Sequence, residues 1–193
     1  MKFLIHSLIL VVVTYAYPQN LGFEIATPPS PDYSLINDYA SSLRFDKDNA
    51  TISFDFIDEE TPGTISGLDF KIDFNPADPE NASFSGSALV ETLDTDNFIR
   101  DGHLMWAKFF HKKKYPKITF ASKQVVSFGT NIYKVIGNLT IKGTTKEVII
   151  TFTLSDKSLT GKTSIHTSDF GVNIHDERER NKLDVQFNFP IIK

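Results

Sequence analysis

The chain has 193 residues, no cysteine, and 24 acidic against 20 basic side chains, which gives a formal net charge of −4 at pH 7. The lack of cysteine excludes a disulfide framework and a lipid-attached cysteine. The mild acidity argues against a nucleic-acid partner, because phosphate binding requires clustered Lys and Arg.

The N-terminal segment, residues 1–16, has the features of a signal peptide. Lys2 precedes an apolar run over 3–13, and Thr14 and Ala16 are small residues of the kind that a signal peptidase reads. About a dozen apolar residues are too few to span a bilayer, which needs ~20, but they suit a signal-peptide core. We therefore predict a secreted or periplasmic protein after cleavage. A buried N-terminal strand or helix is the alternative.

The next segment, residues 17–38, is rich in proline, with Pro28-Pro29-Ser30-Pro31 at its centre. Proline lacks the backbone donor that a central strand needs. The segment is therefore predicted to be a linker, although an ordered wrap along a sheet edge fits the same composition. Residues 39–193 are long enough for one domain with its own core.

Alternating apolar and polar residues dominate this domain, most clearly in 68–74 and 183–189. Successive side chains of a strand point to opposite faces, so the alternation predicts strands with one apolar and one solvated face. Similar runs occupy Ile52–Phe56, Phe84–Leu93, Ile118–Phe128, Tyr133–Ile141 and Val148–Leu154.

Turn signals separate these runs, and no helical period extends beyond about three turns. About eight strands joined by short turns predict an antiparallel all-β fold, either a barrel or a sandwich. A parallel α/β fold is disfavoured. The turn signals are Thr61-Pro62-Gly63, Asn75-Pro76, Phe128-Gly129-Thr130-Asn131, Gly143-Thr144 and Ser155-Asp156-Lys157.

A short helical segment is predicted near residues 97–111. Asp96 or Asn97 can cap its N-terminus, since a short side-chain oxygen accepts from the first free backbone donors. Leu104, Lys108 and Phe109 would then share one face. Such a helix either plugs one end of a barrel as part of a ligand site or simply covers that end.

Several short motifs follow one another in the order found in the YceI-like family, and the resemblance extends from about Leu43 to the C-terminus. It implies an antiparallel, eight-stranded, lipocalin-like barrel that is secreted and holds a polyisoprenoid lipid. Thr167 departs from the family pattern, because many members have Arg there. The motifs are Arg100-Asp101 with His103-Leu104, Phe109-Phe110, Tyr115-Pro116 with Ile118-Thr119-Phe120, Gly137 to Val148, and Asp169-Phe170-Gly171.

The chain contains 17 phenylalanines, several of which alternate on the predicted inner faces. An eight-stranded barrel is just wide enough to be filled by side chains or to hold one small ligand, and alternation does not distinguish the two. An apolar wall favours an isoprenoid tail at about 25 cal/mol per Å² buried. The predicted cavity residues are Phe54, Phe56, Phe70, Ile72, Phe74, Phe109, Phe110, Phe120, Phe152 and Phe187.

The predicted mouth of the barrel consists of His103, Trp106, Lys112 and Lys113. The basic run 112–114 is either a solvated turn or a contact for anionic headgroups, worth ~1 kcal/mol per residue near an anionic surface. A peripheral membrane contact and a homodimer are therefore kept as candidate interactions.

The sequence carries no signature of an enzyme. His103, His111, His166 and His175 form no HxH or HExxH pair, and no metal site or cofactor is predicted. The chain has no GxSxG, P-loop or dinucleotide motif. We predict that the protein binds and sequesters or transports a long isoprenoid of quinone or polyprenyl type. The alternative is a filled barrel that acts in envelope stress or binds a partner without lipid.

Overall fold

The computed structural model describes residues 42–192. The predicted signal peptide (1–16) and the proline-rich linker (17–38) lie outside the described residues. Within 42–192, the only α-helix is too short to reach across a bilayer.

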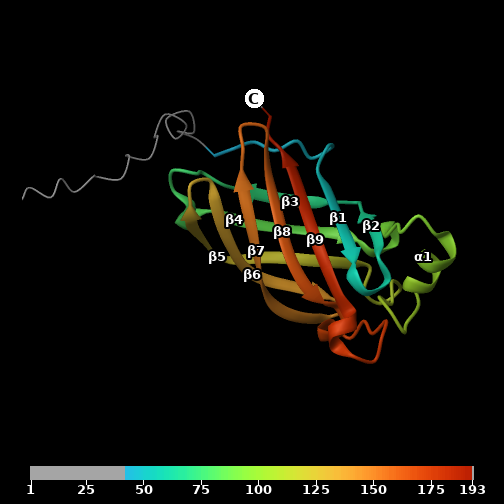
Figure 1. Ribbon diagram of the computed structural model, residues 1–193. Helices are drawn as coiled ribbons and strands as arrows, with labels where there is room; N and C mark the ends of the chain where they lie inside the picture. The colour runs from blue at the N-terminus through green and yellow to red at the C-terminus, as the bar shows by residue number, and fades with distance from the viewer. Residues whose placement is uncertain (1–41, 193) are drawn as a thin grey trace, which may run out of the picture. The chain divides into compact units, whose positions relative to one another are not determined.

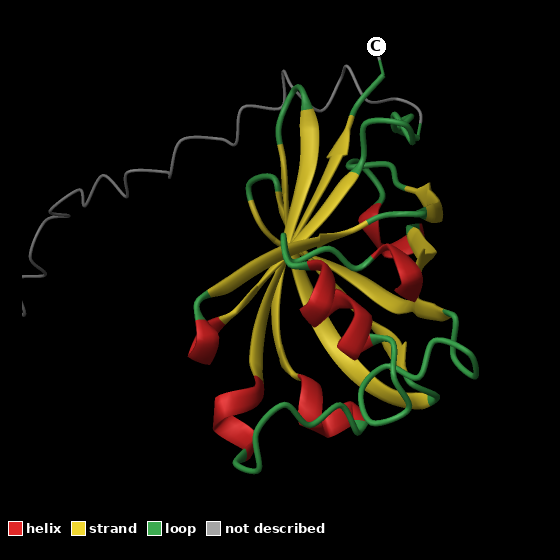
Figure 2. Ribbon diagram, turned by 90° about the vertical axis from the view of Figure 1, so that its right-hand side faces the viewer, coloured by secondary structure: helices red, strands yellow, loops and turns green. Residues whose placement is uncertain are grey.

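The described residues form one antiparallel sheet in the order β2-β1-β9-β8-β7-β6-β5-β4-β3, curled into a half-barrel (Figures 1 and 2). This confirms the predicted antiparallel, lipocalin-like all-β fold, with nine strands where eight were expected. The strands are β1 (Thr51–Phe56), β2 (Thr61–Ile65), β3 (Asp69–Asp73), β4 (Ser83–Leu89), β5 (Lys117–Gly129), β6 (Ile132–Ile141), β7 (Thr144–Leu154), β8 (Ser158–His166) and β9 (Lys182–Pro190). Short 3₁₀ helices are η1 (Ile57–Glu59), η2 (Pro79–Asn81), η3 (Val90–Thr92), η4 (Thr167–Phe170) and η5 (Arg178–Asn181).

Strand β2 accounts for one difference from the prediction, because it contains the residues 61–63 that were expected to form a turn. Pro62 pairs with Asp55 of β1, and β2 is the first strand in the sheet order. An edge strand tolerates proline, since a missing donor on its outer side breaks no ladder. The segment after β4 then covers part of this edge through an isolated bridge between Thr64 and Asp94.

The other turn predictions agree with the strand boundaries, and the β6–β7 turn shows why. Lys142 and Gly143 form a two-residue loop between the paired residues Ile141 and Thr144, with φ of 51° and 77°. A two-residue hairpin loop of type I′ has positive φ at both positions, which glycine adopts without strain. A Cβ on Gly143 would also lie 2.6 Å from the Tyr115 ring.

Aromatic side chains fill the barrel at the end that carries the β5–β6 and β7–β8 turns. Phe74 is fully buried, with its ring centroid 4.8 Å from that of Tyr133, and Phe84 stacks on Phe152 at 5.3 Å. A second buried cluster, which includes Val90, lies at the other end, where η3 follows β4. The two clusters leave the space between them for a cavity.

The α-helix of the described residues, α1, spans Phe98–Leu104 at this second end (Figure 1). The Asn97 side chain caps it by accepting from the backbone nitrogens of Ile99 and Arg100 at 3.2 and 3.1 Å. The helix ends at Leu104 and turns follow, so the predicted helical segment to residue 111 is too long. The Phe110 nitrogen donates to the Leu104 carbonyl at 3.0 Å, which folds the following turn back under the helix.

Candidate ligand-binding cavity

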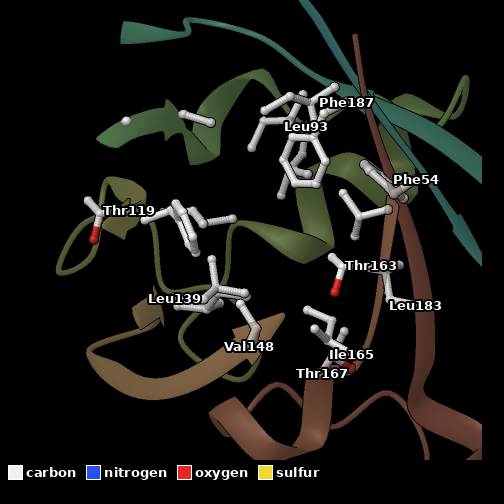
Figure 3. Close-up of a pocket in the computed structure, with 18 of the residues that line it drawn as sticks. Phe54, Leu93, Thr119, Leu139, Val148, Thr163, Ile165, Thr167, Leu183 and Phe187 are labelled. Atoms are coloured by element: carbon white, nitrogen blue, oxygen red, sulfur yellow. The ribbon is translucent and has the colours of Figure 1, made fainter. Parts of the chain in front are cut away.

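The half-barrel encloses a cavity of about 410 Å³ between the aromatic-filled end and α1 (Figure 3). Ligand pockets in proteins are typically ~300–1,000 Å³, and most of their lining is apolar. The side chains around this cavity are also mostly apolar. The interior is thus filled by aromatic rings at one end and holds a cavity between that end and α1, a combination that the sequence left open.

Strand alternation turns the cavity residues inward. Ile52, Phe54 and Phe56 of β1 all line the cavity, while Asp55 between them does not. Directly across the ladder, Phe187 of β9 pairs with Ile52 and also lines the cavity. Apolar residues at every second position therefore build a continuous apolar wall from neighbouring strands.

Glycine makes room for two of the large rings. Gly63 lies directly opposite Phe54 in the β1–β2 ladder, and a Cβ there would collide with the Phe54 ring. A Cβ on Gly137 would lie 2.5 Å from the Phe120 ring. Both rings lie over bare backbone, so a side chain at either glycine would push a ring out of place.

Eight of the ten predicted cavity residues line the cavity: Phe54, Phe56, Phe70, Ile72, Phe110, Phe120, Phe152 and Phe187. Their role in binding a ligand stays a prediction. Phe74 and Phe109 were placed wrongly. Phe74 belongs to the packed aromatic end, and Phe109 packs beside the second cluster, outside the lining.

The predicted mouth residues gather on and after α1, although none of them belongs to the lining. The His103 and Trp106 rings pack with centroids 4.4 Å apart. The Lys112 amine lies 2.7 Å from the Glu91 carboxylate, and Lys113 is exposed. These side chains thus surround the α1 end without entering the cavity.

Sequence reasoning missed the polar end of the cavity. The Arg100 Nε and Nη2 donate to the Thr95 hydroxyl and carbonyl, each at 2.7 Å, and Nη1 lies 3.5 Å from the Thr61 hydroxyl. The Asp101 carboxylate in turn accepts from the Thr95 hydroxyl at 2.5 Å. In the sequence Arg100 was visible only as a motif residue, because the inward position of Arg100 and Thr95 depends on where the segment before α1 lies in the fold. Leu93, Leu104, Ile165, Thr167, Val172, Ile174, Leu183 and Val185 also line the cavity.

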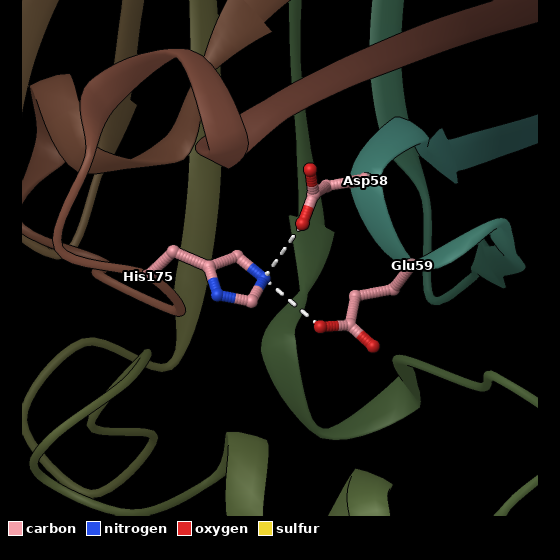
Figure 4. A group of neighbouring side chains, drawn as sticks. All are labelled: Asp58, Glu59 and His175. Atoms are coloured by element: carbon pink, nitrogen blue, oxygen red, sulfur yellow. Dashed lines mark ion pairs between the residues drawn. The ribbon is translucent and has the colours of Figure 1, made fainter.

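A charged cluster joins η1 to the loop before η5 at the same end (Figure 4). The His175 Nε2 lies 2.9 Å from a Glu59 oxygen and 3.3 Å from an Asp58 oxygen. The three donor atoms lie within 4.8 Å of one another, a spacing that a metal ion accepts. Arg180, however, donates to the same Asp58 oxygen at 2.9 Å and lowers the pKa of that carboxyl. The Arg180–Asp58 pair therefore already engages this cluster and ties η5 to η1.

The sequence that builds this half-barrel matches a known family over nearly all of the described residues. The model of the YceI-like domain matches residues 43–191. The chain belongs to the YceI-like family. The family resemblance of the sequence motifs is thereby confirmed.

Two relatives of this YceI-like chain illustrate the sequence similarity. A UPF0312 protein of Ectopseudomonas mendocina (strain ymp) is 35% identical over 88 residues, which cover 46% of this chain and 46% of the relative. A UPF0312 protein of Pseudomonas savastanoi pv. phaseolicola is 28% identical over 120 residues, covering 57% and 62%. In the first of these, the match spans about half the length of the curated relative.

Solved structures share the fold. BcnA of Burkholderia cenocepacia superposes with a TM-score of 0.69 at 22% identity, covering 78% of this chain and 100% of BcnA. The Campylobacter jejuni YCEI protein gives 0.62 at 24% identity, covering 68% and 84%. A polyisoprenoid binding domain from Saccharophagus degradans, implicated in plant cell wall breakdown, gives 0.53 at 13% identity, covering 78% and 96%.

Proposed function

We propose that this YceI-like protein binds a long isoprenoid lipid, of quinone or polyprenyl type, inside the cavity and thereby sequesters or transports it without catalysing a reaction. The observation that carries the proposal is the apolar cavity of about 410 Å³ in a fold shared with a polyisoprenoid binding domain. Burial of apolar surface returns about 25 cal/mol per Å², less the cost of ordering the tail. The driving force would therefore come from the tail.

We infer that the way into the cavity lies at the α1 end. Arg100 and Glu59 both line the cavity and are both exposed, which supports an opening near them. The packed aromatic rings close the opposite end. A lipid would therefore enter with its tail first and keep its headgroup near α1.

We further propose that the α1 end touches a membrane surface. The outer side of this segment exposes Phe98 by 84%, Ile99 by 57% and Trp106 by 58%. Trp is favoured at membrane–water interfaces, and the nearby lysines 112–114 suit anionic headgroups. We also propose that the protein is secreted or periplasmic after cleavage of residues 1–16. Formation of a homodimer is a separate prediction.

A matched pair of substitutions on β7 tests the cavity proposal. Val148 lines the cavity, whereas its neighbour Ile149 is exposed on the outer face. Val148→Trp should fill the cavity and abolish binding of geranylgeraniol or a long-chain quinone in solution, while Ile149→Trp should leave it intact. Equal binding by wild type and both variants would place the lipid outside the cavity and refute the proposal.

A further inference from the structure

The His175 side chain at the α1 end points between two carboxylates without hydrogen-bonding to either (Figure 4). Its Nε2 lies 2.9 Å from a Glu59 oxygen and 3.3 Å from an Asp58 oxygen, and within residues 42–192 this buried nitrogen has no hydrogen-bond partner. The Nε2 of His166, in contrast, makes a hydrogen bond to Glu179 at 3.2 Å. The His175 nitrogen therefore has two oxygens within reach but lacks the alignment that a hydrogen bond needs.

These short separations are those expected around a metal ion. Ligand atoms that lie about 2.0–2.2 Å from a tetrahedral zinc ion are ~3.3 Å from one another. The two separations from Nε2, 2.9 and 3.3 Å, are close to that value, and all three donor atoms lie within 4.8 Å of one another. Imidazole nitrogen and carboxylate oxygen both bind zinc, and many zinc sites combine three protein ligands with a water in the fourth position. The donor set therefore fits a zinc ion.

The imidazole is held in place by neighbours that do not use its Nε2. Asn181 is fully buried, and its side-chain oxygen accepts from the backbone nitrogens of Ile174 and His175 at 2.8 and 3.1 Å. Its side-chain nitrogen donates to the His175 carbonyl at 2.8 Å. The Phe56 ring also stacks on the imidazole, with ring centroids 6.0 Å apart. Groups that orient a metal ligand before the ion arrives strengthen binding.

Arg180 lies beside the cluster but does not neutralise its charge. The guanidinium Nε and Nη2 donate to a single Asp58 oxygen at 3.0 and 2.9 Å, and Nη1 lies 3.6 Å from a Glu177 oxygen. A carboxylate accepts at about four lone-pair sites, so Asp58 keeps capacity for a metal ion. Asp58, Glu59 and Glu177 carry three negative charges against one positive charge, which leaves a formal charge of −2. A divalent cation bound by a neutral imidazole balances that charge.

We propose that Asp58, Glu59 and His175 form a zinc site that cross-links η1 to the loop before η5. The site holds one rim of the cavity in place, because Glu59 lines the cavity and so does Ile174, which precedes His175. Short sequence motifs for zinc did not indicate this site, because its two acids and its histidine are far apart in the chain. The proposal does not depend on which cargo the cavity holds.

Isothermal titration of untagged, metal-free protein with zinc chloride tests the site. Wild-type protein should bind one zinc ion per chain, and binding should raise its thermal unfolding temperature, because the ion binds the folded state. Glu59→Gln and His175→Gln should each weaken zinc binding by at least about tenfold, a loss that even groups behind a metal ligand commonly cause. The Glu59 side chain is half-exposed, so Glu59→Gln keeps the test informative if His175→Gln impairs folding.

His166→Gln is the matched control. His166 and Glu179 also form a histidine–carboxylate pair, but among the described residues no third Asp, Glu or His completes a donor set there. His166→Gln should therefore keep the zinc affinity of wild-type protein, and a loss equal to that of Glu59→Gln would indicate non-specific adhesion and overturn the proposal. Wild-type protein that shows no saturable zinc binding, or Glu59→Gln that binds zinc as tightly as wild type, would overturn it as well.

Discussion

Arg178 and Asp169 form a doubly hydrogen-bonded ion pair, with Nε to Oδ1 at 2.8 Å and Nη2 to Oδ2 at 2.6 Å. The pair joins η5 to η4 and so ties the loop between β8 and β9 back onto the end of β8. This loop carries Val172 and Ile174 of the cavity lining. The ion pair therefore supports one wall of the cavity opening from outside.

This ion pair should make stability depend on acid pH. The Arg178 hydrogen bonds hold the pKa of Asp169 below its ordinary value of 3.8. A carboxyl with a lowered folded-state pKa contributes stability above the unfolded value and loses it as pH falls through the folded value. Arg178→Gln should therefore cost up to about 1 kcal/mol at pH 7, as for a partly exposed pair, and much less near pH 3. Denaturant unfolding at both pH values measures this, and an equal cost at both would contradict it.

Gly137 should be intolerant of a side chain. A Cβ there meets the Phe120 ring and the Ala121 carbonyl, both at 2.5 Å. Gly137→Ala should destabilise the protein by about 1–3 kcal/mol, as overpacking does, and weaken lipid binding by displacing the ring into the cavity. Gly102→Ala in α1 is the control, because a Cβ there meets nothing within 4 Å. Thermal unfolding of the two variants tests this, and wild-type stability in Gly137→Ala would show that the ring moves freely.

Thr167 and Thr163 should respond in opposite ways to removal of their hydroxyls. Both line the cavity, but the buried Thr167 hydroxyl, in a residue only 4% exposed, has no hydrogen-bond partner in the described structure. The Thr163 hydroxyl donates to the Ile149 carbonyl at 2.9 Å. An unpaired buried hydroxyl costs about 1–3 kcal/mol, and a typical hydrogen bond contributes about 0.5–1.5 kcal/mol.

Accordingly, Thr167→Val should stabilise lipid-free protein by about 1 kcal/mol, and Thr163→Val should destabilise it by a similar amount. Denaturant unfolding of the two variants beside wild type measures both effects. Destabilisation by Thr167→Val would mean that the hydroxyl has a partner, such as a bound water.

If the α1 end contacts membranes, substitution of its exposed aromatic residues should weaken binding to vesicles. Phe98→Ser with Trp106→Ser should weaken flotation with vesicles that contain anionic lipid by at least about tenfold, because interfacial anchoring is lost. Phe128→Ser is the matched control, since that ring is 64% exposed but lies near the end of β5, away from α1. Equal loss in both variants would indicate non-specific adhesion.

Alternation predicted the cavity wall well wherever the inward residues were large and apolar, as in β1 and β9. It did not reveal β8, whose inward positions include Gly161 and Thr163 beside Leu159 and Ile165. Hydrogen bonding to β7 and β9 defines this strand more than its own hydrophobic pattern does. Local sequence could not reveal the pairing with β9, because partners such as Thr163 and Val185 are distant in the chain.

The helical segment shows a second limit of prediction from sequence. Asn97 was recognisable as a cap, since capping depends on a few adjacent residues. The placement of the segment before α1 involves instead a long-range bridge between Thr64 and Asp94, which adjacent residues do not reveal. Phe109 was predicted to share a helix face with Leu104 and Lys108, but α1 ends at Leu104.

Native mass spectrometry of protein purified from the envelope of its own host, followed by organic extraction of the bound material, tests the central claim most directly. We expect one isoprenoid per protein, and the extract would identify its length and headgroup. A protein that remains empty, even after incubation with quinones, polyprenols and polyprenyl phosphates, would contradict lipid binding and favour a role for the outer surface of the barrel.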